Sequence, residues 1–221
     1  MNELENVDHS YTAEIVRKGI HLSSLAIPIV YYFLSRSTAL AILMPLTMAF
    51  LLSDVSRLFF PAIGRFYEQV FGWLLRTHER LDRGRHLNGA TYVLLSAVLC
   101  VWIFPKVIVI TAFAILIISD SAAALVGRRF GNHPFLAKTL EGSSAFLATA
   151  LIVVAIAPKI AYLSGEYMIG AAAALLGTLV EAAELGVDDN LSIPLSVGTA
   201  LWLLYAAFLP TLDLYALDRL V

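Results

Sequence analysis

Four short polar segments of this chain carry the residues best suited to chemistry, and each adjoins an apolar run. The first segment reads EIVRKGIH, from Glu14 to His21. Glu14, Lys18 and His21 fall three to four residues apart, so on a helix they share one face. That face is hard to explain as lipid-facing, because His21 begins the apolar run. The simpler interpretation is that Arg17 and Lys18 only set the topology of a membrane helix.

The second segment, residues 118–131, reads ISDSAAALVGRRFG and places Asp120 after a nearly unbroken apolar run. Burying a carboxylate at this depth in a membrane costs at least about 2.5 kcal/mol, so such residues usually face a cavity or a partner. A carboxylate for a cation, glycines for close backbone approach and arginines for phosphate oxygens suit a metal-bound phosphate. The alternative is a packing Asp120 paired with a nearby arginine. The glycines and arginines concerned are Gly127, Arg128, Arg129 and Gly131.

The third segment, KTLEGSSAF, runs from Lys138 to Phe146 and opens another apolar run. Lys138 is a mobile point charge suited to phosphate, and Thr139 and Ser143 supply hydroxyls near a helix N-terminus. The alternative for this segment is local: Glu141 caps the helix that begins here.

The fourth segment, EAAELGVDDN, holds four carboxylates within residues 181–190. Hard oxygen ligands at this density suggest Mg²⁺, which prefers one or two carboxylates plus substrate phosphates. A solvated acidic loop is the alternative. Cationic phosphate ligands and anionic metal ligands together are what phosphoryl or nucleotidyl transfer requires. The chain contains neither a G-x-x-x-x-G-K-[ST] motif nor the protein-kinase signature set, so the predicted donor site follows neither common design.

The composition indicates what must position these segments. The chain has 221 residues, of which 59% are hydrophobic and 14% are charged, and its mean hydropathy is +0.80. An ordinary soluble domain is about 45–50% apolar and about 25% charged. We therefore predict an all-α, polytopic transmembrane helix bundle. The net charge of −2 gives no indication of a nucleic-acid partner.

About seven membrane spans are predicted from apolar runs of roughly 17 residues or more. Proline and charge together mark sharp breaks between several of them. With the N-terminus in the cytoplasm, eleven of the fifteen Lys and Arg residues fall on the cytoplasmic side, which agrees with the positive-inside rule. This topology puts all four polar segments on the cytoplasmic face of an integral, multi-pass membrane protein, in the cell membrane if the source is bacterial. The predicted spans are 20–35, 37–53, 89–104, 107–126, 143–163, 167–182 and 191–210.

These spans divide the chain into a cytoplasmic segment (1–19), a single transmembrane catalytic domain (20–210) and a C-terminal tail (211–221). In the long 54–88 loop, apolar residues from Phe60 to Leu74 recur at helical spacing. This pattern predicts an amphipathic helix in the membrane interface, or a short helix packed on the bundle.

At its polar segments the sequence resembles the membrane-bound polyprenol kinase family, which groups dolichol kinase, phytol kinase and CTP-dependent diacylglycerol kinase. The matching pieces run in order from Glu14 to about Pro194. They are Arg17-Lys18 with His21, Asp120 followed seven residues later by Gly127, RRFG, KTLEGS from Lys138 to Ser143, and EAAELGVDDNLSIP. The resemblance implies transfer of phosphate from a nucleoside triphosphate, commonly CTP, to a lipid alcohol, with a divalent cation.

Phosphatidate cytidylyltransferase is the nearest alternative, since its family also carries an Asp, a GR-x-FG stretch and a K-T-x-E-G step. That family closes with a glycine pair and an Asp-Arg-x-x-Asp-type segment, whereas Glu181 to Asn190 contains no arginine. The difference favours the kinase.

A transporter or a non-catalytic scaffold is the alternative of another class, but transporters place ionisable groups near the midplane and often show repeats. The sequence does not determine the oligomeric state.

The hypothesis that follows assigns Mg²⁺, the nucleotide and the acceptor to named residues. The acceptor enters from the bilayer and keeps its tail in hydrocarbon. Asp120, Lys138 and Asp189 are the candidate catalytic residues, with Asp120 or one of the later pair of aspartates as the base. The candidate metal ligands are Asp120, Glu181, Asp188 and Asp189. The candidate nucleotide-binding residues are Arg17, Lys18, Gly127, Arg128, Arg129, Gly131, Lys138, Thr139, Glu141, Gly142 and Ser143, with Glu14, His21 and Asn190 nearby.

Overall fold

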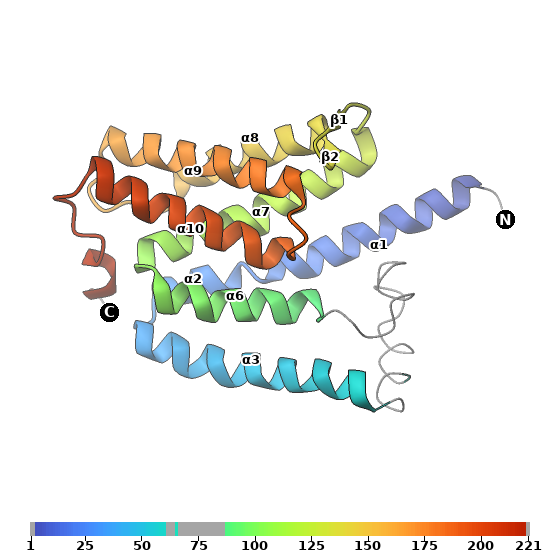
Figure 1. Ribbon diagram of the computed structural model, residues 1–221, viewed down its shortest axis with the longest axis horizontal. Helices are drawn as coiled ribbons and strands as arrows, with labels where there is room; N and C mark the ends of the chain where they lie inside the picture. Colours follow the sequence, from blue (N-terminus) through green and yellow to red (C-terminus); the bar gives the residue numbers. More distant parts are fainter. Residues whose placement is uncertain (1–2, 61–64, 66–86, 220–221) are drawn as a thin grey trace.

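The computed structural model describes residues 3–60, 65 and 87–219, which form a bundle of helices lying roughly along one direction (Figure 1). One small hairpin, of two paired two-residue strands, interrupts the helices. The described part is otherwise helical, as predicted. The helices are α1 (Glu3–Ser23), α2 (Ala26–Tyr32), α3 (Arg36–Phe59), α6 (Gly89–Ile103), α7 (Lys106–Phe130), α8 (Leu140–Ile156), α9 (Ser164–Ala183), α10 (Asp189–Phe208) and the 3₁₀ helix η1 (Ala216–Arg219), and the strands are β1 (Pro134–Phe135) and β2 (Lys138–Thr139).

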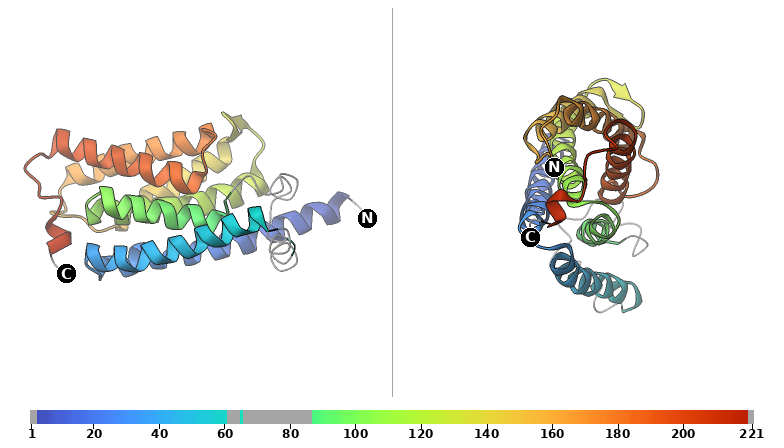
Figure 2. Two further views of the ribbon diagram at one scale, coloured as in Figure 1. Left: turned by 60° about the horizontal axis from the view of Figure 1, so that its bottom comes forward. Right: turned by 90° about the vertical axis from the view of Figure 1, so that its left-hand side faces the viewer.

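Helix α7 forms the core of the bundle. In its most apolar window 78% of the residues are buried, against 22% for α3, which packs on α6 at the edge of the molecule (Figures 1 and 2). A helix that is apolar around most of its circumference lies either in the core of a protein or within a membrane. Helices α1, α2, α8 and α10 all contact α7. Segments distant in the sequence are therefore held against one central helix.

The bundle has two ends that differ in content. We call the end at which α7 ends and α10 begins the hairpin end, because β1 and β2 lie there (Figure 1). The opposite end, where α7 begins and η1 lies, is the tail end. Helices α3, α7 and α9 run toward the hairpin end, and α6, α8 and α10 run away from it (Figure 1).

The predicted count of seven spans is not confirmed. Four of the described helices are long and apolar enough to cross a membrane: α3, α7, α9 and α10. Helices α6 and α8 are apolar but have only 15 and 17 residues. The first predicted span, 20–35, is two helices, because α1 ends at Ser23 and the seven-residue α2 follows. Pro28 has no N–H to donate to the carbonyl of Ser24, and its ring would clash with that carbonyl in a continuous helix, so α1 does not continue into α2.

Two further boundaries differ from the predictions. The span predicted to reach residue 163 ends at Ile156, because Pro158 cannot continue α8 and the chain then turns toward α9. Helix α3 continues through Arg57 to Phe59, beyond the start of the predicted 54–88 loop. The amphipathic helix predicted within that loop falls on residues 61–64 and 66–86, which lie outside the described part of the chain.

Close packing of α10 generates a prediction about stability. A Cβ on Gly198 would lie 2.7 Å from Cε2 of Phe104, whose ring is 2% exposed and has no room to move. Gly198→Ala should therefore destabilise the protein by about 1–3 kcal/mol. The measurement is thermal unfolding of the purified protein in detergent.

Gly19→Ala is the matched control, because a Cβ on Gly19 meets nothing within 4 Å. Alanine is the better helix former, so this variant should unfold at or above the wild-type temperature. Equal effects of the two substitutions would contradict the packing described for α10.

Candidate functional site

A buried charge pair joins α1 to α7 within the half of α7 that is nearer the hairpin end. Lys18 Nζ donates to Asp120 Oδ2 at 2.5 Å, and His21 Nε2 lies 3.5 Å from the same oxygen. Lys18 is 5% exposed and Asp120 is 8% exposed. Their positions follow from helical spacing, since Lys18 and His21 lie three residues apart on one face of α1. The structure thus brings together three of the residues predicted from the first two segments.

A second group lies one turn earlier on α1. Glu14 is 1% exposed and forms ion pairs with Arg17 of its own helix and with Arg128 of α7. The Arg128 Nη2 to Glu14 Oε2 distance is 2.9 Å. One buried carboxylate therefore holds two guanidinium groups from two helices beside the Lys18–Asp120 pair.

Lys138 is the centre of a third group. Its Nζ donates to Glu181 Oε1 at the end of α9 and to Asp189 Oδ2 at the start of α10, both at 2.8 Å. The hairpin sets this position, because its turn residue Ala137 donates its backbone N–H to the carbonyl of Ala182 at 3.0 Å. β2 is thereby fixed beside the end of α9.

The two carboxylates keep Lys138 charged. Burial by itself lowers the pKa of Lys138, but Asp189 and Glu181 more than offset this, and the pKa is raised above its ordinary value. Lys138 also acts electrostatically on Asp120, so the first and third groups lie close enough to be coupled. The first and third groups thus share one electrostatic environment at the hairpin end.

The glycines of this region serve helix packing. A Cβ on Gly142 would lie 3.1 Å from the carbonyl oxygen of Ala123, and one on Gly127 would lie 3.4 Å from Cα of Gly142. Gly131 is tighter still, at 2.3 Å from the carbonyl oxygen of Gly127. Close approach of α7 to α8 thus explains glycine at 127 and 142, whereas at 131 a side chain would meet the end of α7 itself. The predicted close approach to phosphate remains a prediction.

The start of α8 assigns local roles to three predicted residues. Thr139 caps the helix, because its hydroxyl accepts the Gly142 N–H at 3.3 Å. The Glu141 carboxylate, in the first turn of α8, accepts the backbone N–H of His133 and contacts the His133 ring at 2.6 Å. Ser143 is buried, and its hydroxyl has no hydrogen-bond partner within the described part of the chain.

The remaining predicted residues lie around this centre. Asp188 caps α10, accepting hydrogen bonds from the backbone and side-chain amides of Asn190 at 2.9 and 2.8 Å. The Arg129 guanidinium lies over the ring of Tyr11, 5.8 Å from its centroid. Within residues 3–60, 65 and 87–219, no group of three or more His, Cys, Asp or Glu side chains is arranged to hold a metal ion.

The sequence analysis missed Asp54, which is 3% exposed in α3 and accepts hydrogen bonds from two groups at the start of α6. The signal was present, because Asp54 follows an apolar run just as Asp120 does. We placed it in a loop because the predicted span ended at residue 53.

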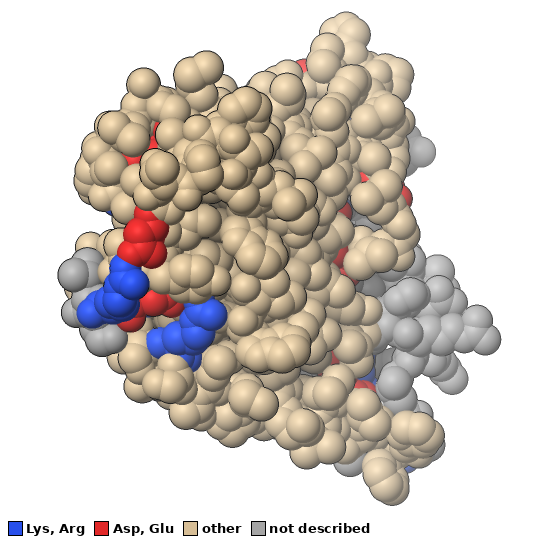
Figure 3. Space-filling model, turned by 60° about the vertical axis from the view of Figure 1, so that its left-hand side comes forward, with Lys and Arg blue, Asp and Glu red and all other residues tan. Residues whose placement is uncertain are grey.

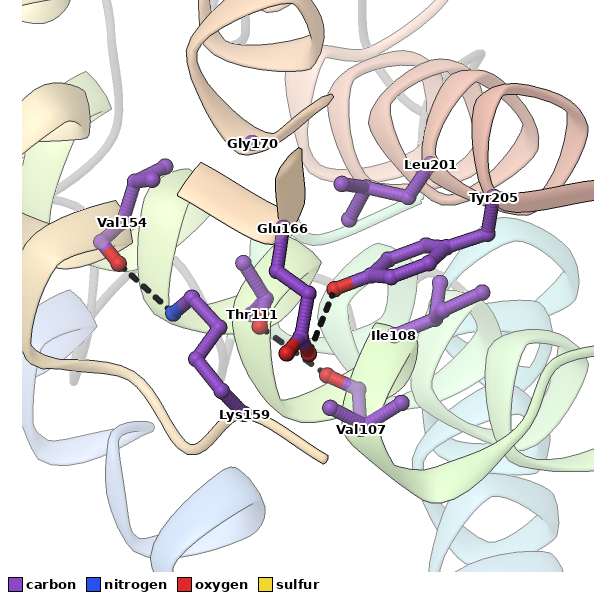
Figure 4. A pocket seen from close by; sticks show the side chains of 9 residues that line it. All are labelled: Val107, Ile108, Thr111, Val154, Lys159, Glu166, Gly170, Leu201 and Tyr205. Atoms are coloured by element: carbon purple, nitrogen blue, oxygen red, sulfur yellow. Dashed lines mark hydrogen bonds between the residues drawn. The ribbon is translucent and has the colours of Figure 1, made fainter. Parts of the chain in front are cut away.

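The tail end also contains buried charged side chains, but most of their hydrogen bonds are with backbone groups. A small cavity there is lined by Glu166 and Lys159, among others (Figure 4). Glu166 accepts three loop N–H groups at 2.9–3.0 Å, and Lys159 donates to the carbonyls of Val154 and Ala157 at 2.7 Å. Turned so that this end comes forward, the surface shows most of its charged side chains in one mixed group (Figure 3).

Comparison with known proteins gives several matches. The uncharacterized protein RP860 of Rickettsia prowazekii is 33% identical over 183 residues, which are 81% of this chain and 89% of that protein. The CTP-dependent diacylglycerol kinase 1 of Schizosaccharomyces pombe is 26% identical over 68% of this chain and 74% of its own. The CTP-dependent diacylglycerol kinase 1 of Saccharomyces cerevisiae is 28% identical over 82% of this chain and 70% of its own. No family model and no solved structure matches the chain.

The Lys18–Asp120 pair generates a prediction about coupled stability. Lys18→Met leaves Asp120 buried without its closest partner and should destabilise the protein by about 3–5 kcal/mol. Adding Asp120→Asn removes the unpaired buried charge. The double variant should therefore lose clearly less stability than the two single variants lose in sum. Denaturant unfolding in mixed micelles measures all three variants.

Lys159→Met is the control, because its ammonium binds carbonyls at the tail end. Its effect should add to that of Asp120→Asn. Additive effects of Lys18→Met and Asp120→Asn would show that these two charges do not interact.

Proposed function

The chain belongs to the same family as RP860 of Rickettsia prowazekii, and we propose that it is a kinase that phosphorylates a membrane lipid alcohol with CTP. The observation that carries the proposal is the convergence of Lys18 with Asp120, and of Lys138 with Glu181 and Asp189, at one end of the bundle. The relatives named CTP-dependent diacylglycerol kinase support both the reaction and the donor.

Movable cations suit the binding of a triphosphate. Lys18 and Lys138 donate to carboxylates, and an ammonium on a flexible stem can exchange a carboxylate for a phosphate oxygen. Arg17 and Arg128 add guanidinium groups, which bind phosphate in a bidentate manner. We assign Lys18, Lys138, Arg17 and Arg128 to the phosphates, with Arg129 at the rim.

The carboxylates fit a divalent cation. Glu181 Oε1 and Asp189 Oδ2 both lie 2.8 Å from one point, the Lys138 nitrogen, so two hard oxygens converge. The other oxygen of Glu181 is buried and has no hydrogen-bond partner among the described residues. Mg²⁺ prefers one or two carboxylates plus phosphate oxygens, so a larger protein cluster is not required. When bound, the cation would neutralise charge on the transferring phosphate.

The chain's own residues position the reactants and hold the proton. The lipid hydroxyl oxygen bonds to the terminal phosphorus while the bond from that phosphorus to the bridging oxygen breaks, and CDP leaves. The hydroxyl proton passes to a carboxylate, for which Asp120 and Asp189 are the candidates. Lysines and arginines around the phosphates stabilise the charge that develops.

We propose diacylglycerol as the first acceptor to test, on the names of the relatives. A polyprenol, dolichol or phytol presents the same hydroxyl at the end of an apolar chain and is an alternative acceptor. We further propose that the hairpin end faces the cytoplasm, where CTP is available. Labelled CTP with membranes and a panel of these lipids tests the donor and acceptor together.

The products separate the possible functions. A phosphorylated lipid with CDP supports the kinase. A CDP-lipid with release of pyrophosphate would identify a cytidylyltransferase instead. If no acceptor or donor gives a lipid product, the proposal fails, and a transporter or a scaffold is the class left open.

Asp120→Asn should reduce kcat at least 100-fold, because it removes the carboxylate that pairs with Lys18 and is a candidate to accept the hydroxyl proton (general base catalysis contributes about 10²–10⁴). The lipid kinase assay on purified protein measures this. Asp213→Asn, an exposed acid at the tail end, is the control and should keep wild-type activity. Wild-type turnover by the Asp120 variant would remove this residue from the mechanism.

Chelation should abolish transfer reversibly. EDTA lowers activity to background, and added Mg²⁺ restores it, because without the cation the two carboxylates would repel the triphosphate. Glu181→Gln should raise the Mg²⁺ concentration needed for half-maximal activity about 10-fold or more. Full activity in EDTA would contradict the assignment of a divalent cation.

A further inference from the structure

Asp54 is a buried carboxylate with no part in the mechanism described above. It lies in α3, is 3% exposed, and its Oδ2 accepts hydrogen bonds at 2.7 Å from both the backbone N–H of Asn88 and the hydroxyl of Thr91. Its other oxygen lies 3.6 Å from the Arg57 guanidinium. Burying a carboxylate in a membrane helix is costly, so its partners define what it does.

Both donors belong to the start of α6. Asn88 is the N-cap of that helix, and its side chain accepts the Ala90 N–H at 3.3 Å. Thr91 is fully buried in the first turn. Asp54 therefore fixes both the residue that begins α6 and the turn that follows.

The start of α6 lies against the start of α10. Gly89 has no side chain, and a Cβ there would lie 3.6 Å from Nδ2 of Asn190. That amide in turn donates to Asp188, the cap of α10. Asp189, the next residue, pairs with Lys138 at 2.8 Å. The helix start that Asp54 fixes thus lies beside the start of α10, which carries the third group of the site.

The tail end contains the same arrangement without a site beside it. Asp218 accepts the backbone N–H of Lys106 at 2.9 Å at the start of α7, and it pairs with Arg36 at 3.1 Å. Each aspartate thus fixes a helix start and pairs with an arginine. The two differ in their surroundings: the helix start that Asp54 fixes lies beside the candidate site, and the one that Asp218 fixes does not.

We infer that Asp54 is a positioning residue, which fixes the first turn of α6 and, through Asn190, holds Asp189 in place to meet Lys138. The inference rests on the proposed kinase function. It predicts that loss of the Asp54 contacts weakens nucleotide binding, whereas loss of the Asp218 contacts affects stability alone.

The test compares Asp54→Asn with Asp218→Asn in the CTP-dependent lipid kinase assay, together with thermal unfolding of each protein. Both variants should unfold at a lower temperature, because each weakens a helix start. Only Asp54→Asn should raise the KM for CTP, by about tenfold, with a smaller change in kcat, as is typical for a residue one layer behind the ligands.

A second pair of variants keeps the test decisive if Asp54→Asn fails to fold. Thr91→Val has nearly the same shape but no hydroxyl, and it should raise the KM for CTP about threefold or more. Thr91→Ser restores the hydroxyl and should return the KM toward the wild-type value.

The outcomes separate the two proposals. If the wild-type protein makes no phosphorylated lipid, the proposed function fails and not the inference alone. If the wild-type protein is active while Asp54→Asn and Thr91→Val lower the unfolding temperature and leave the KM for CTP unchanged, Asp54 is a structural residue and the inference is overturned. A rise in KM for Asp218→Asn equal to that for Asp54→Asn would overturn it as well.

Discussion

The organisation of this bundle depends on the cost of placing carboxylates among apolar helices. Asp120 lies within the most buried helix of the molecule, where an uncompensated charge would be strongly destabilising. Lys18 compensates it from α1, 102 residues away in sequence. The same requirement brings Lys138 to Glu181 and Asp189. Pairing of acids with bases thus determines which helices meet at the hairpin end.

Glu166 at the tail end and the three acids of the candidate site are satisfied in different ways. At the tail end, Glu166 accepts three backbone N–H groups, which are fixed by the fold and cannot leave. At the hairpin end, Asp120, Glu181 and Asp189 bind lysines on flexible stems. A fixed donor makes a rigid turn, whereas a mobile cation can exchange one anion for another. This difference is the physical reason for assigning chemistry to the hairpin end.

Much of the site could be predicted from the sequence, because charged residues next to apolar runs stand out and helical spacing places Lys18 and His21 on one face. The individual pairings could not, since they depend on how α1, α7, α9 and α10 pack. Asp54 was missed because the end of α3 was placed too early. The span count failed where Pro28 divides a continuous apolar run, and where α6 and α8 are shorter than a full span. Gly127 and Gly142 lie where α7 approaches α8, and their approach to a phosphate stays a prediction.

The central claim is that distant acids and bases meet at one rim of the membrane. Asn132→Cys and Val187→Cys mark exposed sites at the hairpin end, and Asp213→Cys marks the tail end, each in a Cys100→Ser background. A membrane-impermeant thiol reagent applied to intact cells should label position 213 alone, and positions 132 and 187 should react only after permeabilisation. Labelling of positions 132 and 187 from opposite sides of the membrane would contradict a shared site.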